Sequence, residues 1–340
     1  MTAPRSWSRG LATVGLLAAL LGAPALSGCD HATEPDGPNL TDRFGPFEID
    51  EGLAANRTAF DFSTDESATF TGLFNKQVAW VLEITGQESG AVKRIEGFSR
   101  EVTPENARWR GGTSELPLFK DETVVAELFV PAESSDTTRV TLEVLQPRTY
   151  PGNVIADFEE GQTFTLTNPE FEFDEVGISD IVPPGQGDGF FLMRGTDDVV
   201  ANNFFIGLIT VRPTEGDYFE VPTNIAEELY FNCFLRGFSE PNTIAVVELE
   251  IEGVGRPVPL GTDVEFPNLG IIDFEGWQLY SEPASSFGQF GAGITDEQTE
   301  RITGVRIVLI SDAANQSNPP NQVAFGIDYL TFTAGGPLEL

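Results

Sequence analysis

The feature that most constrains this chain is an apolar residue at every second position, repeated in many short segments. Residues 140–144 alternate between apolar and polar side chains, and residues 245–251 do the same, with glutamates on the opposite face. Successive side chains of a β-strand point to opposite faces of a sheet, whereas an amphipathic helix repeats every 3.6 residues. The sequence contains no long amphipathic helical pattern and no tandem repeat. It therefore predicts an all-β chain.

Two folded units are expected, with a boundary at residues 146–152, where two prolines and a glycine interrupt the strand pattern. The first unit, residues 44–147, has short strands separated by turn clusters at the spacing of a β-sandwich. Its clearest strands are residues 78–85, 107–110, 124–130 and 139–145.

The second unit, residues 153–333, is larger and more aromatic. Residues 229–235 and 245–251 flank a turn cluster, which predicts a hairpin. Residues 204–211 and 305–310 are apolar on both faces, as is typical of central strands. Thr295 and Gln298 have the spacing of a capping box that begins one short helix.

An irregularity near the end of the second unit predicts a β-bulge. Apolar residues occupy odd positions from 323 to 327 and then even positions at 330 and 332. One extra residue in a strand produces such a phase shift and re-aims the side chain at the slip. That side chain is Asp328 or Tyr329.

The N-terminal segment has the three parts of a secretory signal peptide. Arg5 and Arg9 are basic, residues 11–21 are apolar, and residues 22–25 are small. The segment ends in Leu26-Ser27-Gly28-Cys29, which resembles the lipobox of bacterial lipoproteins, in which the cysteine thiol is acylated and becomes the new N-terminus.

This resemblance implies a lipoprotein signal peptide at residues 1–28, lipidation at Cys29 and a flexible tether at residues 29–43. An ordinary signal peptide followed by a chance cysteine is the alternative. The protein is expected in the bacterial cell envelope, attached to a membrane through its N-terminal lipid. The outer membrane or cell surface is favoured over the inner membrane.

The charge of the chain excludes one class of partner. It has 53 acidic and 19 basic side chains, and residues 1–28 contain two of the arginines. Nucleic-acid binding rests on basic side chains that neutralise phosphates, so nucleic acid is excluded. A surface this acidic stays soluble at high ionic strength, which indicates a halophilic source.

The residue types present in the chain give little support to a catalytic function. The only histidine, His31, lies in the tether, which excludes Ser–His and Cys–His nucleophiles and histidine-based zinc sites. Cys233 lies inside an apolar strand pattern and is expected to be a buried, inert thiol. A glycosidase carboxylate pair is not excluded by counting, but nothing marks any two acids as such a pair.

Each unit resembles a known class of β-sandwich. The segment around Trp80, the turn at Ser89-Gly90, Trp109 and the strand at residues 124–130 resemble bacterial immunoglobulin-like (Ig-like) spacer modules, and another small β-sandwich is the alternative. The second unit resembles the galactose-binding-like jelly roll of carbohydrate-binding modules and surface glycan-binding lipoproteins. This second resemblance rests on residues 156–159, 185–194, 229–235, 245–251, 276–287, 295–310 and 325–332. Together they predict an Ig-like β-sandwich followed by a larger jelly-roll β-sandwich.

The jelly-roll resemblance implies a structural calcium site. In related modules the opening acid and an aspartate of the closing strand lie side by side, which on this chain implies Asp157, Glu159 and Asp328 as ligands. Ca²⁺ takes six to eight oxygen ligands, so carbonyls or water would be needed as well. Tyr329 stands where the family commonly has asparagine, which weakens the assignment of the family's calcium ligands to this chain. The alternative is that Asp157 and Asp328 only cap or hydrogen-bond the bulged strand.

Four aromatic residues within residues 277–290 are the candidate ligand-binding residues: Trp277, Tyr280, Phe287 and Phe290. Small turn residues lie among them, which predicts a loop. Sugars are held by aromatic faces that stack on the apolar side of the ring, with polar groups taking the hydroxyls. Trp277 itself is expected to lie in the core at the start of a strand, with a ligand-binding role as the alternative, and Tyr280 and Phe287 are the better surface candidates.

The sequence therefore predicts a lipid-anchored, non-catalytic envelope protein that binds a polysaccharide or other glycan. An envelope structural or adhesion protein whose jelly roll contacts protein is the alternative, and a glycoside hydrolase is a third.

Overall fold

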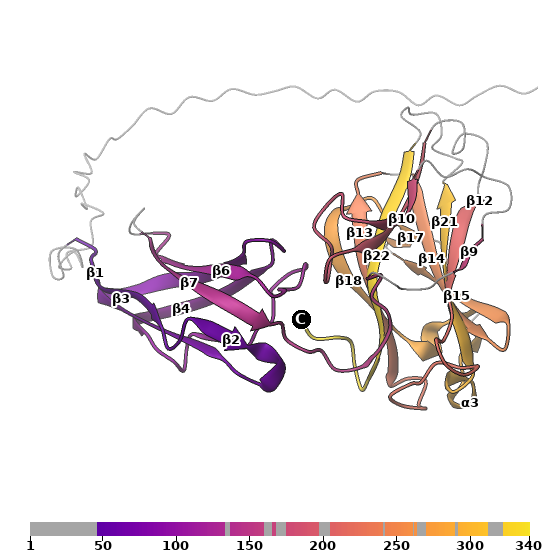
Figure 1. Cartoon of the computed structure of the whole chain (residues 1–340), viewed down its shortest axis with the longest axis horizontal. Helices are drawn as coiled ribbons and strands as arrows, with labels where there is room; N and C mark the ends of the chain where they lie inside the picture. The colour runs from indigo at the N-terminus through magenta and orange to yellow at the C-terminus, as the bar shows by residue number, and fades with distance from the viewer. Residues whose placement is uncertain are drawn as a thin grey trace, which may run out of the picture. The chain divides into compact units, whose positions relative to one another are not determined.

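The strands of the chain form two groups of sheets, as Figure 1 shows for the computed structural model. It describes residues 46–340 except 133–136, 160–164, 168–174, 197–204, 241, 261, 264–269, 290–291 and 312–321. The signal peptide and tether, with Cys29 and His31, lie outside the described residues. No helix within the described ranges is long and apolar enough to span a membrane.

The first group is a seven-stranded sheet in the order β1-β3-β6-β7-β2, with β4 and β5 also paired to β3. Its strands are β1 (Ile49–Ala55), β2 (Ala59–Asp61), β3 (Ala68–Gly86), β4 (Val92–Val102), β5 (Arg108–Trp109), β6 (Thr123–Phe129) and β7 (Thr138–Gln146). The sheet curls around one apolar core that contains Trp80 and Trp109, each 1% exposed. The four strands expected in this unit are confirmed.

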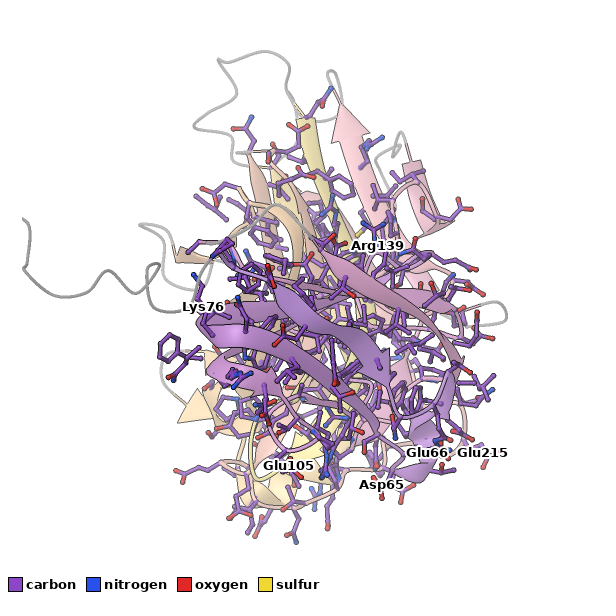
Figure 2. The ribbon with its side chains drawn as sticks, turned by 90° about the vertical axis from the view of Figure 1, so that its left-hand side faces the viewer. Asp65, Glu66, Lys76, Glu105, Arg139 and Glu215 are labelled. Carbon is purple, nitrogen blue, oxygen red and sulfur yellow. The ribbon has the colours of Figure 1, made fainter. Side chains whose placement is uncertain are left out.

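The acidic composition is visible on the surface of this unit. Asp65, Glu66 and Glu105 belong to turns between its strands, and their side chains are among those labelled in Figure 2. Arg139 on β7 forms an ion pair with Glu127 on β6 at 3.7 Å.

The second group contains a six-stranded and a seven-stranded sheet that pack face to face. One has the order β10-β11-β22-β13-β18, with β8 paired to β22, and the other has the order β16-β17-β14-β21-β12-β9, with β15 paired to β14. The first sheet contains β8 (Asn153–Ala156), β10 (Glu175–Ser179), β11 (Phe190–Thr196), β13 (Leu229–Phe238), β18 (Glu275–Pro283) and β22 (Gln322–Ala334). The second contains β9 (Thr165–Thr167), β12 (Phe205–Val211), β14 (Thr243–Ile251), β15 (Val254–Leu260), β16 (Thr262–Asp263), β17 (Gly270–Ile271) and β21 (Ile302–Ser311).

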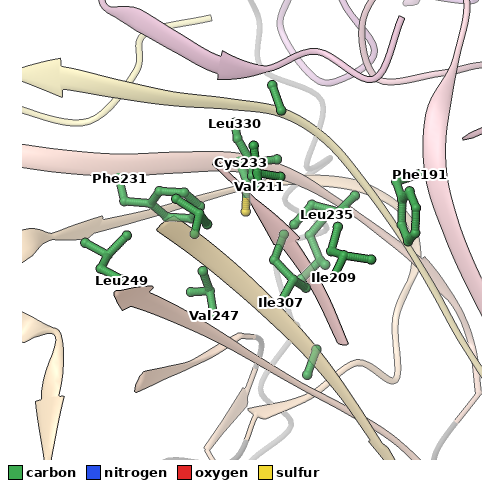
Figure 3. Close-up of a cluster of buried hydrophobic side chains, with 14 of the residues drawn as sticks. Phe191, Ile209, Val211, Phe231, Cys233, Leu235, Val247, Leu249, Ile307 and Leu330 are labelled. Carbon is green, nitrogen blue, oxygen red and sulfur yellow. The ribbon is translucent and has the colours of Figure 1, made fainter. Parts of the chain in front are cut away.

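The facing sides of these two sheets share one hydrophobic core. Phe231 and Leu235 on β13 contribute to it from one sheet, and Val247 on β14 and Ile307 on β21 contribute from the other (Figure 3). Cys233 lies in this core, fully buried and unpaired, and burial raises the pKa of its thiol. The all-β, sandwich-like fold and the burial of Cys233 are thus confirmed.

The β-bulge near the end of the second unit is also confirmed. The register between β13 and β22 shifts between the pair Asn232–Thr331 and the pair Phe234–Asp328. Tyr329 has a φ of 44°, a left-handed conformation that a regular strand does not contain. Because of this slip, Ile327 and Leu330 both reach the same core.

One local prediction in the second unit is confirmed and two are wrong. The hairpin expected from residues 229–235 and 245–251 does not form, because β13 and β14 cross from one sheet to the other and pair with different strands. The capping box is present, since the backbone N–H of Thr295 donates to the side chain of Gln298 at 3.0 Å at the start of α3 (Asp296–Thr299). The loop expected at residues 277–290 is wrong, because its first part is strand β18, hydrogen-bonded along β13 and followed by a 3₁₀ turn at Ala284–Ser286.

Candidate functional site

A pocket of about 520 Å³ lies beside the outer face of β18. Glu275, Trp277 and Leu279 belong to β18, and residues 114–116 follow β5 in the first sandwich. We call this pocket the Trp277 groove; its lining residues are Ser114, Glu115, Leu116, Glu275, Trp277, Gln278, Leu279 and Leu340. Both sandwiches belong to one compact unit, Pro46–Leu340.

Strand alternation puts Trp277 on this face. It pairs with Arg236 on β13, and Leu279 pairs with Phe234, two positions that point away from the core shared by the large sheets. Gly276, which precedes Trp277, has a φ of 100°, a conformation that a side chain would strain. The start of β18 therefore depends on glycine.

The indole ring of Trp277 is held in one orientation. Its Nε1–H donates to the carbonyl oxygen of Pro183 at 2.8 Å, and its ring meets that of Phe190 edge-on at 5.3 Å. The ring is only partly buried and lines the groove. A fixed, partly exposed aromatic ring can stack on a ligand with little loss of side-chain entropy.

Polar groups flank the ring. Glu275 forms an ion pair with Arg236 at 2.7 Å, and the side chains of Ser114 and Glu115 are exposed at the opposite wall. These groups donate and accept hydrogen bonds around an apolar surface, which is the arrangement that recognises a neutral polyhydroxylated molecule.

The other predicted aromatic residues do not join the groove. Phe287 is 0% exposed and packs edge-on against Phe231 at 5.9 Å, so its assignment to a ligand surface is wrong. It was misplaced because it follows a strand and a 3₁₀ turn that carry it into the core, whereas a loop was expected. Tyr280 pairs with Cys233 and packs against the core, and Phe290 lies outside the described residues.

The predicted calcium ligands surround a second feature, the loop at residues 185–189. Asp328, on the bulge of β22, is 0% exposed, and its Oδ2 accepts from the backbone N–H of Gln186 at 2.8 Å. Its Oδ1 accepts from the backbone N–H of Tyr329 at 2.7 Å. Glu159 Oε1 accepts from the backbone N–H of Asp188 at 2.9 Å, so two carboxyl groups hold the loop.

Burial dominates the electrostatics of these acids. It raises the pKa of Asp328 well above the usual aspartate range, against the lowering effect of the N–H groups of Gln186 and Tyr329, and the charges of Glu159 and Asp157 raise it further. Burial also raises the pKa of Glu159. A carboxyl group in such surroundings favours the protonated form unless a cation compensates its charge.

The calcium site stays a prediction. Within the described ranges, no three acidic, histidine or cysteine side chains are grouped so as to hold a metal ion. The side-chain oxygen of Gln186 is buried without a hydrogen-bond partner, which is one oxygen that a cation would use. The contacts that the structure describes are those of the alternative interpretation, in which Asp328 hydrogen-bonds the bulged strand and its neighbouring loop.

Sequence reasoning missed the first-sandwich wall of the groove. Residues 114–116 are separated from β18 by more than 150 positions, and their composition is that of an ordinary turn. No periodicity or motif relates the two segments. Their proximity depends on how the sandwiches pack, which includes a hydrogen bond from the backbone N–H of Leu118 to the carbonyl of Gly185 at 2.9 Å.

Comparisons with solved structures find carbohydrate-binding modules among the proteins similar to this chain. No protein-family model matches the chain, and no curated protein matches it. The family 11 carbohydrate-binding module of a cellulosomal cellulase of Clostridium thermocellum is 12% identical, with a TM-score of 0.33, over 55% of this chain and 96% of that one. The CBM22-1 xylan-binding domain from Paenibacillus barcinonensis is 13% identical, with a TM-score of 0.31, over 55% of this chain and 97% of its own.

A third similar structure is SGBP-B from a complex xyloglucan utilization locus in Bacteroides uniformis. It is 14% identical, with a TM-score of 0.34, over 84% of this chain and 73% of that one. At identities and scores this low, function has to be inferred from the residues of this chain.

Proposed function

We propose that this protein binds a polysaccharide or other glycan at the bacterial cell envelope, without catalysing a reaction on it. The observation that carries the proposal is Trp277, a partly exposed indole ring held by Pro183 and Phe190 in a groove of about 520 Å³. An aromatic ring offers a stacking surface for the C–H face of a sugar, and Glu275, Glu115 and Ser114 offer partners for its hydroxyl groups.

Attachment to the membrane is a separate part of the proposal. It rests on the segment Leu26-Ser27-Gly28-Cys29 and on its resemblance to a lipobox. The lipid on Cys29 would anchor the chain, and the tether at residues 29–43 would extend the binding unit away from the bilayer. We place the anchored protein in the outer membrane or at the cell surface.

We also propose a structural calcium ion beside the loop at residues 185–189. Asp328, Glu159 and Asp157 would supply its charge, and Gln186 a neutral oxygen. Neutralising the buried carboxylate of Asp328 would stabilise the loop at residues 185–189, and the pH experiment in the Discussion distinguishes this from a protonated Asp328.

Affinity electrophoresis of the full chain tests the function. Mixed-linkage β-glucan, xylan and xyloglucan are suitable neutral polymers, and we expect at least one to retard the protein. Trp277→Ala should weaken that binding at least about tenfold, since truncating a central tryptophan of a binding site typically costs more than 1 kcal/mol. If the wild type is retarded by none of the polymers in a broad panel, the function is wrong.

Two further variants separate binding from stability. Trp277 packs on Phe190, so its truncation also affects folding. Glu115→Ala removes an exposed groove carboxylate, and it should weaken binding severalfold while leaving the melting temperature unchanged. Phe98, 69% exposed on β4, is the control aromatic, and Phe98→Ala should bind as the wild type does. Equal losses in Phe98→Ala and Trp277→Ala would place the site elsewhere.

A further inference from the structure

Two half-buried cations of this strongly acidic chain form no ion pair within 4 Å in the region that the structure describes. The chain has 53 acidic and only 19 basic side chains, so most bases find an acid nearby. Ion pairs are formed by Lys120 and by the arginines at 57, 94, 100, 139, 212, 236, 301 and 306. The half-buried side chains of Lys93 and Arg148 form none with the described residues.

Both cations lie at one turn of the first sandwich. Lys93 Nζ donates to the carbonyl oxygen of Thr113 at 3.4 Å. Arg148 Nη1 lies so close to Gly112 that a Cβ there would be 2.7 Å from it. The turn is fixed in place, because the Nε1–H of Trp109 donates to the carbonyl of Gly112 at 2.8 Å.

Holding Lys93 and Arg148 close together without an anion costs free energy of folding. Burial and the positive charge of Arg148 lower the pKa of Lys93, which means that two like charges are held near each other partly out of water. The guanidinium of Arg148 lies 4.9 Å from the centre of the Tyr150 ring, and the hydroxyl of Tyr150 is buried without a hydrogen-bond partner. Buried charges and buried hydroxyls are normally paired, so an anion would satisfy the site.

Space for a ligand lies next to Arg148 and adjoins the Trp277 groove. A pocket of about 250 Å³ is lined by Arg148, Pro151, residues 333–337 and Glu339. A terminal main-chain oxygen of Leu340, a residue that lines the Trp277 groove, would be 3.3 Å from a Cβ at Gly112, the position that Arg148 Nη1 also approaches. A ligand in the groove can therefore extend to Arg148.

We propose that Arg148 and Lys93 bind the carboxylate of an acidic sugar residue carried by the glycan. This rests on the proposed function and names its ligand more closely. A guanidinium binds a carboxylate through two parallel N–H···O bonds, and Lys93 adds a second positive charge. The formal net charge of −34 repels a polyanion, so the ligand is a largely neutral polysaccharide with isolated uronic acid residues.

Isothermal titration of the full chain with sodium glucuronate, at constant ionic strength, tests the site directly. We expect glucuronate to bind at least about tenfold more tightly than glucose, and Arg148→Gln to abolish the difference. Arg110→Gln is the matched control, since Arg110 is an exposed arginine of the same sandwich, and it should behave as the wild type does. Equal affinities for glucuronate and glucose would overturn the proposal, and acetate binding as tightly as glucuronate would overturn the assignment to a sugar acid.

Polymers distinguish a failure of this inference from a failure of the proposed function. Glucuronoxylan and the same polymer with its carboxyl groups reduced to alcohols share one backbone. Tighter retardation by the native polymer, lost in Arg148→Gln, supports the inference. Equal retardation by both polymers supports glycan binding and overturns the acidic-sugar site.

Glu339 lines the same pocket and is the internal competitor for Arg148. A double-mutant cycle with Arg148→Gln and Glu339→Gln measures their coupling. We expect the two shifts in melting temperature to add, and Glu339→Gln to bind glucuronate at least as well as the wild type. If the double variant melts no lower than either single variant, the two side chains pair with each other and the proposal is overturned.

Discussion

Replacing Asp328 by asparagine is expected to cost stability by an amount that shrinks as the pH rises. Asp328 is 0% exposed, and its two oxygens accept from two different N–H groups, those of Gln186 and Tyr329. Asparagine has one side-chain oxygen, so one of these N–H groups would face an NH₂ donor. A buried donor without an acceptor costs about 1–3 kcal/mol, and this cost is nearly pH-independent.

The pH dependence comes from the wild type. Burial raises the pKa of Asp328, so folding makes the carboxyl group hold its proton more tightly. Above the unfolded-state pKa of about 3.9 the folded chain therefore binds more protons than the unfolded chain, and stability falls as the pH rises until Asp328 ionises in the folded state. Each unit by which the pKa is raised amounts to about 1.4 kcal/mol. Asparagine does not titrate, so the gap between the two proteins should narrow between pH 4 and pH 8.

Urea unfolding of both proteins across this range is the assay. Asp273→Asn is the control at an exposed aspartate, with an expected change of less than about 0.5 kcal/mol at every pH. A gap that stays constant would mean that Asp328 titrates normally. A gap that widens with pH would mean that ionised Asp328 stabilises the fold, and if EGTA then restores the narrowing, Asp328 holds calcium.

Three other substitutions test separate parts of the structure. Phe287→Ala should lower the free energy of unfolding by about 3–5 kcal/mol, because the ring is buried against Phe231, and a loss below 1 kcal/mol in thermal unfolding would return Phe287 to the surface. Gly97→Ala places a Cβ inside the Trp80 ring, so we expect a loss of about 1–3 kcal/mol and a changed near-ultraviolet circular dichroism spectrum, and an unchanged spectrum contradicts this. Cys29→Ser should abolish incorporation of labelled palmitate, and labelling that persists would refute the proposed anchor.

The strands were predictable because their periodicity is local. A period of two occurs in any strand with one face in a core, and it identified β6 and β7 in the first unit and β13 and β14 in the second. It did not reveal that β13 and β14 belong to opposite sheets, so the hairpin expected from them was wrong. The β-bulge was also predictable from the sequence, because the register shift at Tyr329 moves the apolar residues from odd to even positions.

The candidate site was only partly predictable because it depends on packing between distant segments. The aromatic cluster contained Trp277, but the core was the favoured place for that residue and the surface for Phe287, and the structure reverses the two. Sequence spacing does not reveal that β18 continues through residue 283 and turns the chain inward. No pattern in the sequence marks Arg148 as a binding residue, because a cation without an ion-pair partner is recognised only when its surroundings are known.

Fluorescence of the wild type and of Trp277→Phe during a polysaccharide titration tests the central claim most directly. Trp80 and Trp109 are each 1% exposed, so among the tryptophans of the described chain only Trp277 can report a ligand that enters the groove. Binding of a retarding polysaccharide should change the emission of the wild type and protect it from acrylamide quenching, and Trp277→Phe should lose both responses. A polysaccharide that binds the wild type without altering either signal would contradict the assignment of the groove as the glycan site.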